Sequence, residues 1–137
     1  MDQICSVAVN SLANRRHQIT CEPSSDFYDA TVRCSVDPKN FGDDIVGRII
    51  NGKFSIAFDN LDNDRQYFFL ESASGGSLVC AQRNVLLQGS VNFRDIGGYL
   101  TESGKRIAWG KIFRSGHLSN LTALGKIAFA KLDVGLV

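Results

Sequence analysis

The sequence predicts a mainly β protein, in which an antiparallel β-sandwich over residues 1–88 precedes the truncated start of an α/β domain over residues 89–137. Two observations support this division. Apolar and polar residues alternate through most of the first region, which is typical of antiparallel strands with one buried face. In the second region, glycines separate short apolar pieces, and the end of the chain has the spacing of an amphipathic helix.

The predicted sandwich strands carry an apolar residue at every second position. Such runs surround Val7, Val32 and Phe54, and the runs 66–72 and 77–83 flank a glycine-bearing loop as a hairpin. No helical pattern competes in this region. About six or seven short strands separated by turn residues therefore predict a β-sandwich that folds independently of the rest.

Two details of the sandwich give specific expectations. Phe54, Ile56 and Phe58 lie on one face of their strand, and we expect all three to be buried. Leu61 stands six residues before Tyr67, which resembles the tyrosine corner of fibronectin type III-like sandwiches. The proline often found inside that pattern is missing, and a chance placement in a strand-turn-strand explains the pair equally well.

The four cysteines are spaced in a way that does not suggest a metal site. Cys5, Cys21, Cys34 and Cys80 include no Cys-x-x-Cys pair, and only two histidines are present. We expect no metal and no cofactor. Buried thiols in a reducing cytosol are the favoured interpretation, with a disulfide as the alternative.

The net charge of +1 gives no basic face for a nucleic acid or an anionic membrane, so neither is an expected partner. No apolar run approaches the roughly 18 residues that span a bilayer. A basic segment followed by an apolar one, as in a signal peptide, is also missing from the N-terminus. These features predict a cytoplasmic protein.

The pattern of the second region predicts an incomplete β-α-β unit. A hairpin with Gly104 at its turn is predicted within residues 99–108, and a strand at 112–113 follows it. A helix is predicted over residues 122–132, capped by Thr122 or Asn120. Residues 134–137 then look like the start of a buried strand.

The predicted helix has an apolar stripe that needs a partner surface. The stripe consists of Leu121, Leu124, Ile127 and Leu132. A helix this short is marginal in water unless that face is packed. We therefore expect segment 118–137 either to be mobile or to bury the stripe against the sandwich or against a second copy of the chain.

The most informative stretch is 91–116, VNFRDIGGYLTESGKRIAWGKIFRSG. Arg94 and Asp95 can form charge-assisted hydrogen bonds around an anion, and Gly97 and Gly98 allow the backbone to approach closely. On chemistry alone, an Asx-type turn that opens a hairpin, with Arg94 in solvent, is the simpler interpretation.

This stretch resembles the opening of the bacterial tyrosine/serine phosphatases of the dual-specificity class. Their catalytic domain begins with an NFRD-(L/V/I)-GG block and reaches an RSG block further along. The resemblance covers roughly residues 87–137 and implies metal-free hydrolysis of phosphomonoesters, on proteins or small molecules, through a phosphocysteine. It also implies supporting roles at the phosphate pocket for Asn92, Phe93, Arg94, Asp95, Gly97, Gly98, Arg114 and Ser115.

By the same resemblance, the nucleophile is a cysteine followed six positions later by an arginine, normally with a histidine before the cysteine. The residues six positions after the four cysteines are Ser11, Phe27, Asn40 and Leu86. We therefore expect an N-terminal piece of a phosphatase with no catalytic residue of its own and no activity. The alternative is a non-catalytic β-sandwich module that binds protein or carbohydrate.

Three other side chains have structural interpretations. His17 shares the phase of Ile19, which predicts a strand-end or core histidine. His117 follows the Arg-Ser-Gly block and is expected in a turn. Trp109 is expected to pack against the hairpin rather than stack on a ligand.

Overall fold

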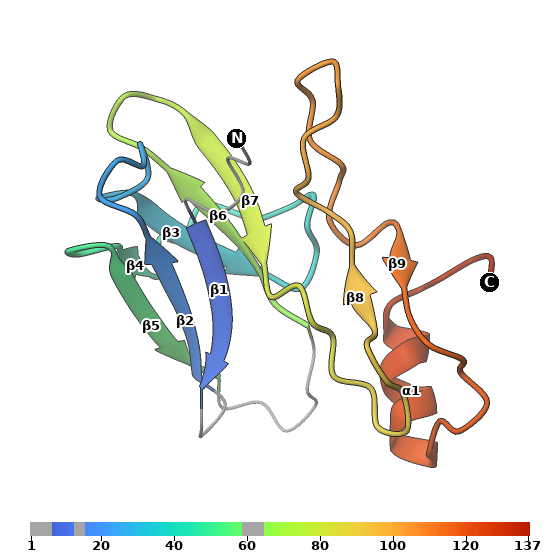
Figure 1. Ribbon diagram of the computed structural model, residues 1–137. Coiled ribbons are helices and arrows are strands. Elements are labelled where there is room, and N and C mark those ends of the chain that lie inside the picture. Colours follow the sequence, from blue (N-terminus) through green and yellow to red (C-terminus); the bar gives the residue numbers. More distant parts are fainter. Residues whose placement is uncertain (1–6, 13–15, 59–64) are drawn as a thin grey trace.

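The computed structural model describes residues 7–12, 16–58 and 65–137. Figure 1 shows two sheets packed face to face, with a smaller sheet and a helix beside them. The large sheets come from the first part of the chain, and the smaller elements come from the part after residue 88. The mainly β fold, with antiparallel sheets and one short helix near the end, confirms the predicted class.

The first sheet of the sandwich has three antiparallel strands in the order β1-β2-β5. They are β1 (Val7–Leu12), β2 (Arg16–Cys21) and β5 (Lys53–Ala57). Ile19 in the central strand lies opposite Phe54 in β5. This register places the apolar residues of the strands on one face, as the alternating pattern predicted.

The second sheet has four antiparallel strands in the order β4-β3-β6-β7. They are β3 (Thr31–Ser35), β4 (Gly47–Arg48), β6 (Tyr67–Glu71) and β7 (Ser77–Ala81). The hairpin β6–β7 is the one predicted around the glycine-bearing loop. Strand β4 has only two residues, too few to give an alternating pattern, and the sequence did not predict it.

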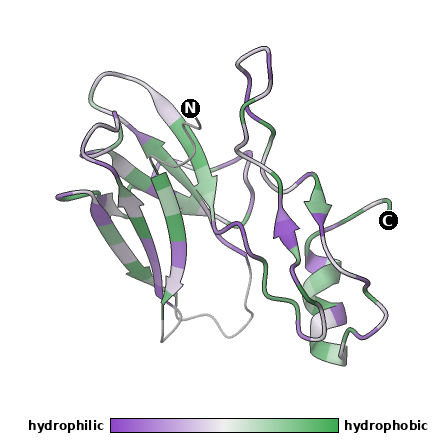
Figure 2. Ribbon diagram, in the orientation of Figure 1, coloured by the Kyte–Doolittle hydropathy of each residue, from purple (hydrophilic) through white to green (hydrophobic). Residues whose placement is uncertain are grey.

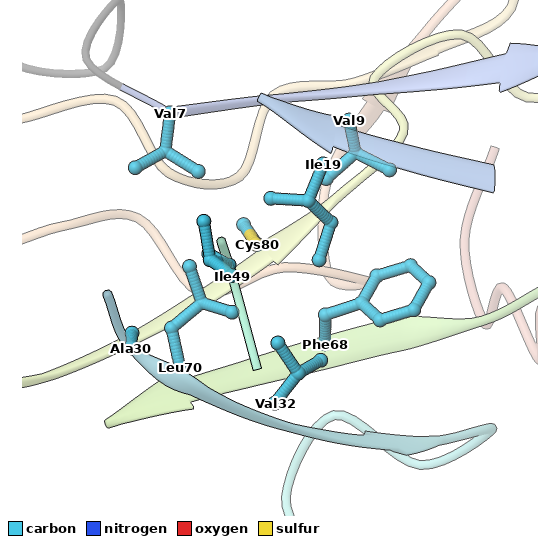
Figure 3. Packing of buried hydrophobic residues seen from close by; sticks show 9 residues of the cluster. All are labelled: Val7, Val9, Ile19, Ala30, Val32, Ile49, Phe68, Leu70 and Cys80. Atoms are coloured by element: carbon cyan, nitrogen blue, oxygen red, sulfur yellow. The ribbon is translucent and has the colours of Figure 1, made fainter. Parts of the chain in front are cut away.

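The two sheets enclose one core. Figure 3 shows its buried side chains, which come from both sheets and from the loops beside them: Val7, Val9, Ile19, Ala30, Val32, Ile49, Phe68, Leu70 and Cys80. Along the strands, hydrophobic and hydrophilic residues alternate (Figure 2). The alternation predicts the sandwich correctly because each strand buries one face and exposes the other.

The expected burial of Phe54, Ile56 and Phe58 is wrong. All three pack against the core, but each is only half buried. β5 is an edge strand of its sheet, so Phe54 and Ile56 have a neighbouring strand on one side only, and Phe58 lies just beyond the end of β5.

The cysteines are free thiols where the structure describes them. Cys80 is buried, whereas Cys21 and Cys34 are half buried. Cys5 and Leu61 lie outside the described residues, so the tyrosine-corner pattern is described only at Tyr67. The Tyr67 hydroxyl accepts a hydrogen bond from Nη1 of Arg65 at 3.0 Å.

The third sheet pairs β8 (Arg94–Asp95) with β9 (Phe113–Arg114) in an antiparallel arrangement. Between them, a bridge from Leu100 to Arg106 forms the predicted hairpin, with Gly104 at a φ of +82° in its turn. The strand predicted at residues 112–113 is β9, shifted by one residue.

Helix α1 (Ala123–Lys131) has the predicted position and the predicted cap. The Thr122 hydroxyl accepts a hydrogen bond from the Gly125 amide at 3.1 Å. This bond satisfies one of the amides that the first turn leaves without a helical partner.

The apolar stripe of the helix is oriented differently from the expectation. Leu124 and Ile127 are 66% and 57% exposed, and the helix packs through Gly125 and Phe129 instead. The expected burial of Leu124 and Ile127 against the sandwich is therefore wrong, and burial against a second copy stays a prediction. Residues 134–137 form no strand. In the described part of the chain, no helix has the length and apolarity to cross a membrane.

Candidate functional site

Arg94 and Arg114 lie directly opposite each other in the β8–β9 pair. Directly opposed residues of an antiparallel pair project from the same face of the sheet, and like charges in that position destabilise it. Among the described residues, Nε of Arg94 is buried without a hydrogen-bond partner, whereas Arg114 is exposed. Two cations thus share one sheet face, and no ion pair joins either of them to another described residue.

The two ends of the 91–116 stretch meet beside this arginine pair. The Gly116 amide donates a hydrogen bond to the Val91 carbonyl at 3.0 Å, which brings the Arg-Ser-Gly block next to Asn92. Asn92 has a φ of +56°, so the backbone turns sharply just before β8. Both Asn92 and Ser115 are exposed, and the Ser115 hydroxyl donates to the Gly116 carbonyl.

Phe93 ties the small sheet to the helix. Its side chain is buried, with its ring centroid 5.2 Å from that of Phe113 and 6.1 Å from that of Phe129. These are ordinary aromatic packing distances. Phe93 therefore holds α1 against β9.

Asp95 faces the opposite way from Arg94, because successive residues of a strand alternate between faces. Its side chain is completely buried, and both carboxylate oxygens accept hydrogen bonds. Oδ1 accepts from the Gly97 amide and Oδ2 from the Gly110 amide, each at 2.8 Å. Oδ2 also accepts from Nη1 of Arg65, which comes from the sandwich.

Gly97 and Gly98 make room for Trp109. A Cβ atom at Gly97 would lie 2.5 Å from the Cα of Trp109, and one at Gly98 would lie 2.7 Å from its ring. Trp109 is buried, as expected for a packing residue, and its Nε1 donates to the Val79 carbonyl in β7 at 2.9 Å. The two glycines thus allow the hairpin to dock on the sandwich.

The described cysteines have no properties of a thiolate nucleophile. Cys21, Cys34 and Cys80 all lie in the sandwich. Burial raises the pKa of the Cys21 thiol to about 11 and raises the pKa of Cys34 and Cys80 as well. A reactive cysteine needs the opposite shift, because the thiolate is the attacking species.

A cleft of about 800 Å³ opens between the sandwich and the end of the chain. Arg65, Tyr67 and Phe113 line it, so it lies on the Asp95 side of the small sheet, away from Arg94. Within the described ranges, no three His, Cys, Asp or Glu side chains are grouped to hold a metal ion.

Residues 85–137 match the model of the tyrosine phosphatase family. The match covers β8, β9 and α1 and excludes the sandwich strands. No curated protein and no solved structure matches the chain. The tyrosine phosphatase match includes all eight residues that the sequence singled out, from Asn92 to Ser115.

Sequence reasoning missed Arg65 and Arg83. Nη1 of Arg83 donates to the Asp95 carbonyl at 2.7 Å, and its guanidinium lies 4.0 Å from the Tyr99 ring centroid. Both arginines come from the region before the matched segment. A motif read along the chain contains no signal for a contact between Arg65 and a carboxylate thirty residues away.

Proposed function

We propose that residues 85–137 form the N-terminal part of the catalytic unit of a cysteine-dependent tyrosine/serine protein phosphatase, in which Arg94 and Arg114 bind the phosphoryl oxygens. The register of β8 and β9, which sets these two cations opposite each other, carries the proposal. The family match over the same residues supports it.

A phosphate dianion between the two guanidinium groups would offset the repulsion between their positive charges. Arginine suits this role because its planar fork of N–H donors matches phosphate oxygens in charge and geometry. The unpartnered Nε of Arg94 is one donor that such an anion would satisfy. Asn92 and Ser115 are short polar side chains in the same part of the surface.

In the complete enzyme, a thiolate attacks phosphorus, the substrate oxygen leaves, and water then hydrolyses the phosphocysteine to release phosphate. This chain has no cysteine with an arginine six positions later. The raised pKa of the thiols of Cys21, Cys34 and Cys80 also argues against a nucleophile among them. We therefore propose that the 137-residue chain binds phosphomonoesters without turning them over.

The sandwich is the second part of the proposal. We regard residues 1–88 as a fibronectin type III-like unit that carries the phosphatase segment 89–137 in a bacterial, cytoplasmic protein. The free thiols of Cys21, Cys34 and Cys80 fit a reducing compartment. No nucleic acid or membrane partner is part of this proposal, because the chain has no strong basic excess.

Binding is tested by titrating the chain with phosphotyrosine while following backbone amide signals. Residues 92–95 and 113–116 should shift together. Loss of one charge-assisted hydrogen bond, worth about 1.5–3 kcal/mol, should weaken binding about tenfold or more in Arg94→Met and in Arg114→Met.

The matched control is Arg48→Met, which removes the same charge from an exposed position in β4. It should leave the affinity within a factor of about two, as expected for a remote surface charge. Equal binding by all three variants, or no binding by the unaltered chain, would show that the arginine pair is not a phosphate site.

Catalysis is tested separately with para-nitrophenyl phosphate. We expect no turnover above that of buffer. Activity that co-purifies with the chain and disappears when its thiols are alkylated would contradict the assignment of a nucleophile outside these residues.

A further inference from the structure

The chain leaving the sandwich pairs directly with β8, in the proposed phosphatase segment. The Asp95 amide donates to the Arg83 carbonyl at 3.0 Å, and the Val85 amide donates to the Phe93 carbonyl at 2.9 Å. Asn84 and Arg94 form the bridge between these bonds. Strand β8 therefore has β9 on one side and the continuation of β7 on the other, with no linker between the two regions.

Arg65 is the side chain that crosses from the sandwich to Asp95. Its Nη1 reaches the buried carboxylate, and its Nη2 donates to the Gln82 carbonyl at 2.7 Å. The guanidinium lies 4.7 Å from the Tyr67 ring centroid and 5.8 Å from that of Phe113. With 13% of the side chain exposed, Arg65 is fixed on the sandwich side as well as at Asp95.

Asp95 connects the fixed Arg65 side chain to both strands of the small sheet. Its carboxylate accepts from the amide of Gly97, just after β8, and from the amide of Gly110, in the turn before β9. These bonds fix where β8 ends and where β9 approaches it. The same pairing sets Arg94 opposite Arg114 on the other face.

We propose that Arg65 is a positioning residue that the sandwich supplies to the phosphatase motif. It orients Asp95, and through the Gly97 and Gly110 turns it maintains the strand register that presents the arginine pair. The proposal deepens the proposed function and, in its phosphate-binding part, rests on it. It makes the sandwich part of the phosphate site's architecture, in contrast to a separately tethered binding module.

A purely local role for Arg65 leads to a different expectation. Arg65 donates to Gln82 and Tyr67 within the sandwich and its immediate continuation, and its guanidinium also lies over the rings of Trp109 and Phe113. A local role would therefore loosen these neighbours and leave the hydrogen bonds that the Asp95 carboxylate accepts in place. A positioning role requires an effect on the amides of Gly97 and Gly110, which bond to the Asp95 carboxylate.

The test uses the full chain with Arg65→Met, Arg65→Lys and the control Arg33→Met. Arg33 is a partly buried sandwich arginine that pairs with Glu71 at 3.9 Å and lies over the Phe69 ring. The measurement is amide hydrogen exchange at Gly97 and Gly110, at a temperature at which the β2 and β6 amides remain protected in every variant.

We expect Arg65→Met to speed exchange at Gly97 and Gly110 about tenfold or more, because the carboxylate that accepts from both amides loses its charged partner. Arg65→Lys should give a smaller increase, because a single ammonium keeps the charge but cannot bond in the same fork geometry. It also tests the proposal if the methionine variant does not fold. Arg33→Met should leave both amides unchanged.

The second measurement is the affinity for phosphotyrosine in the same folded variants. Arg65→Met should weaken this affinity about tenfold and Arg65→Lys should weaken it less. Both effects would arise although the side chain at position 65 does not face the arginine pair. Exchange at Gly97 and Gly110 that is no faster in the Arg65 variants than in Arg33→Met would overturn the positioning role, whatever the affinity. If the unaltered chain binds no phosphotyrosine, the proposed function fails, and the exchange rates still decide the structural role of Arg65.

Discussion

Gly125 of α1 packs directly against the carbonyl oxygen of Gln88. A Cβ atom at position 125 would lie 2.1 Å from that oxygen and 3.3 Å from the side chain of Leu121. The Thr122 amide donates to the same carbonyl at 3.1 Å, and the Thr122 hydroxyl lies 2.6 Å from the Gln88 side-chain oxygen. The start of the helix is therefore fixed to the turn that follows the sandwich.

This contact reverses the usual effect of replacing a helical glycine. By helix propensity alone, Gly125→Ala would stabilise the protein by about 1 kcal/mol. The added carbon meets a backbone oxygen that cannot rotate away. We therefore take the cost of this overpacking at the upper end of the usual range, about 3 kcal/mol. We expect the free energy of unfolding to fall by about 2 kcal/mol, measured by urea denaturation.

Lys126→Ala is the control for this prediction, because the residue is exposed in the same helix. It should change the free energy of unfolding by less than about 0.5 kcal/mol. If Gly125→Ala were more stable than the unaltered chain, the close packing of α1 on Gln88 would be wrong.

We expect His17 to make the stability of the protein depend on pH. Its ring is half buried between Phe58 and Phe68, with centroids 5.3 Å and 6.0 Å away, and burial lowers its pKa from the ordinary 6.5. Among the described residues, its Nδ1 has no hydrogen-bond partner. The folded state therefore favours the neutral ring.

The direction of the effect follows from linkage. Well above pH 6.5 the ring is neutral in both states, and its contribution to stability is fully present. As the pH falls below 6.5, the unfolded chain gains the proton first, so stability is lost until the pH reaches the lower pKa of the folded state. Thermal midpoints measured on either side of pH 6.5 should show this loss.

His17→Phe should reduce that loss, since no group at position 17 would then titrate. The control is His117→Asn, because His117 is exposed, with its Nδ1 2.9 Å from the Ser119 hydroxyl, as expected of a turn residue. If the unaltered chain and His17→Phe lost equal stability on acidification, His17 would not be the group responsible.

The sandwich phenylalanines should contribute unequally to the free energy of unfolding. Phe68 is fully buried in the central strand β6, whereas Phe54 is half buried in the edge strand β5. We expect Phe68→Ala to cost about 3–5 kcal/mol of unfolding free energy and Phe54→Ala clearly less. Equal losses in denaturant titrations would mean that the two sheets close over β5 more tightly than the structure indicates.

The parts of the fold that the sequence predicted are those determined locally. Alternation located the sandwich strands because a two-residue period reports which face is buried. Thr122 and the apolar spacing located α1 because a cap acts within one helical turn. The failures concern long-range packing. The spacing of Leu124 and Ile127 cannot show that the helix approaches its neighbour through Gly125 instead.

The candidate site shows the same limit. The sequence singled out Arg94, Arg114 and the glycines from their motif, and the pairing of β8 with β9 places the two arginines opposite each other. The motif alone did not distinguish the two faces of β8. It therefore grouped Asp95 with Arg94, although the carboxylate is buried toward Arg65 on the other side.

The independent folding of the sandwich gives the last prediction. All nine residues of its core cluster lie between Val7 and Cys80, so a chain ending at Gln88 keeps that core intact. It loses Asp95, the partner of Arg65, and Trp109, which packs on Tyr67 and Ala81. We expect the shortened chain to keep β-type circular dichroism and a cooperative thermal transition, but at a lower midpoint than the full chain.

Asp95→Asn in the full chain separates the two causes of that lower midpoint. The substitution keeps Trp109 in place but leaves the Arg65 guanidinium confined without its carboxylate, which typically costs about 3–5 kcal/mol when a buried pair loses one partner. In the shortened chain, Arg65 can instead be hydrated. The loss of stability of the shortened chain should therefore come mainly from the newly exposed apolar surface of Tyr67 and Ala81, at about 25 cal/mol per Å². A shortened chain without a cooperative transition would show that the sandwich depends on residues 89–137 to fold.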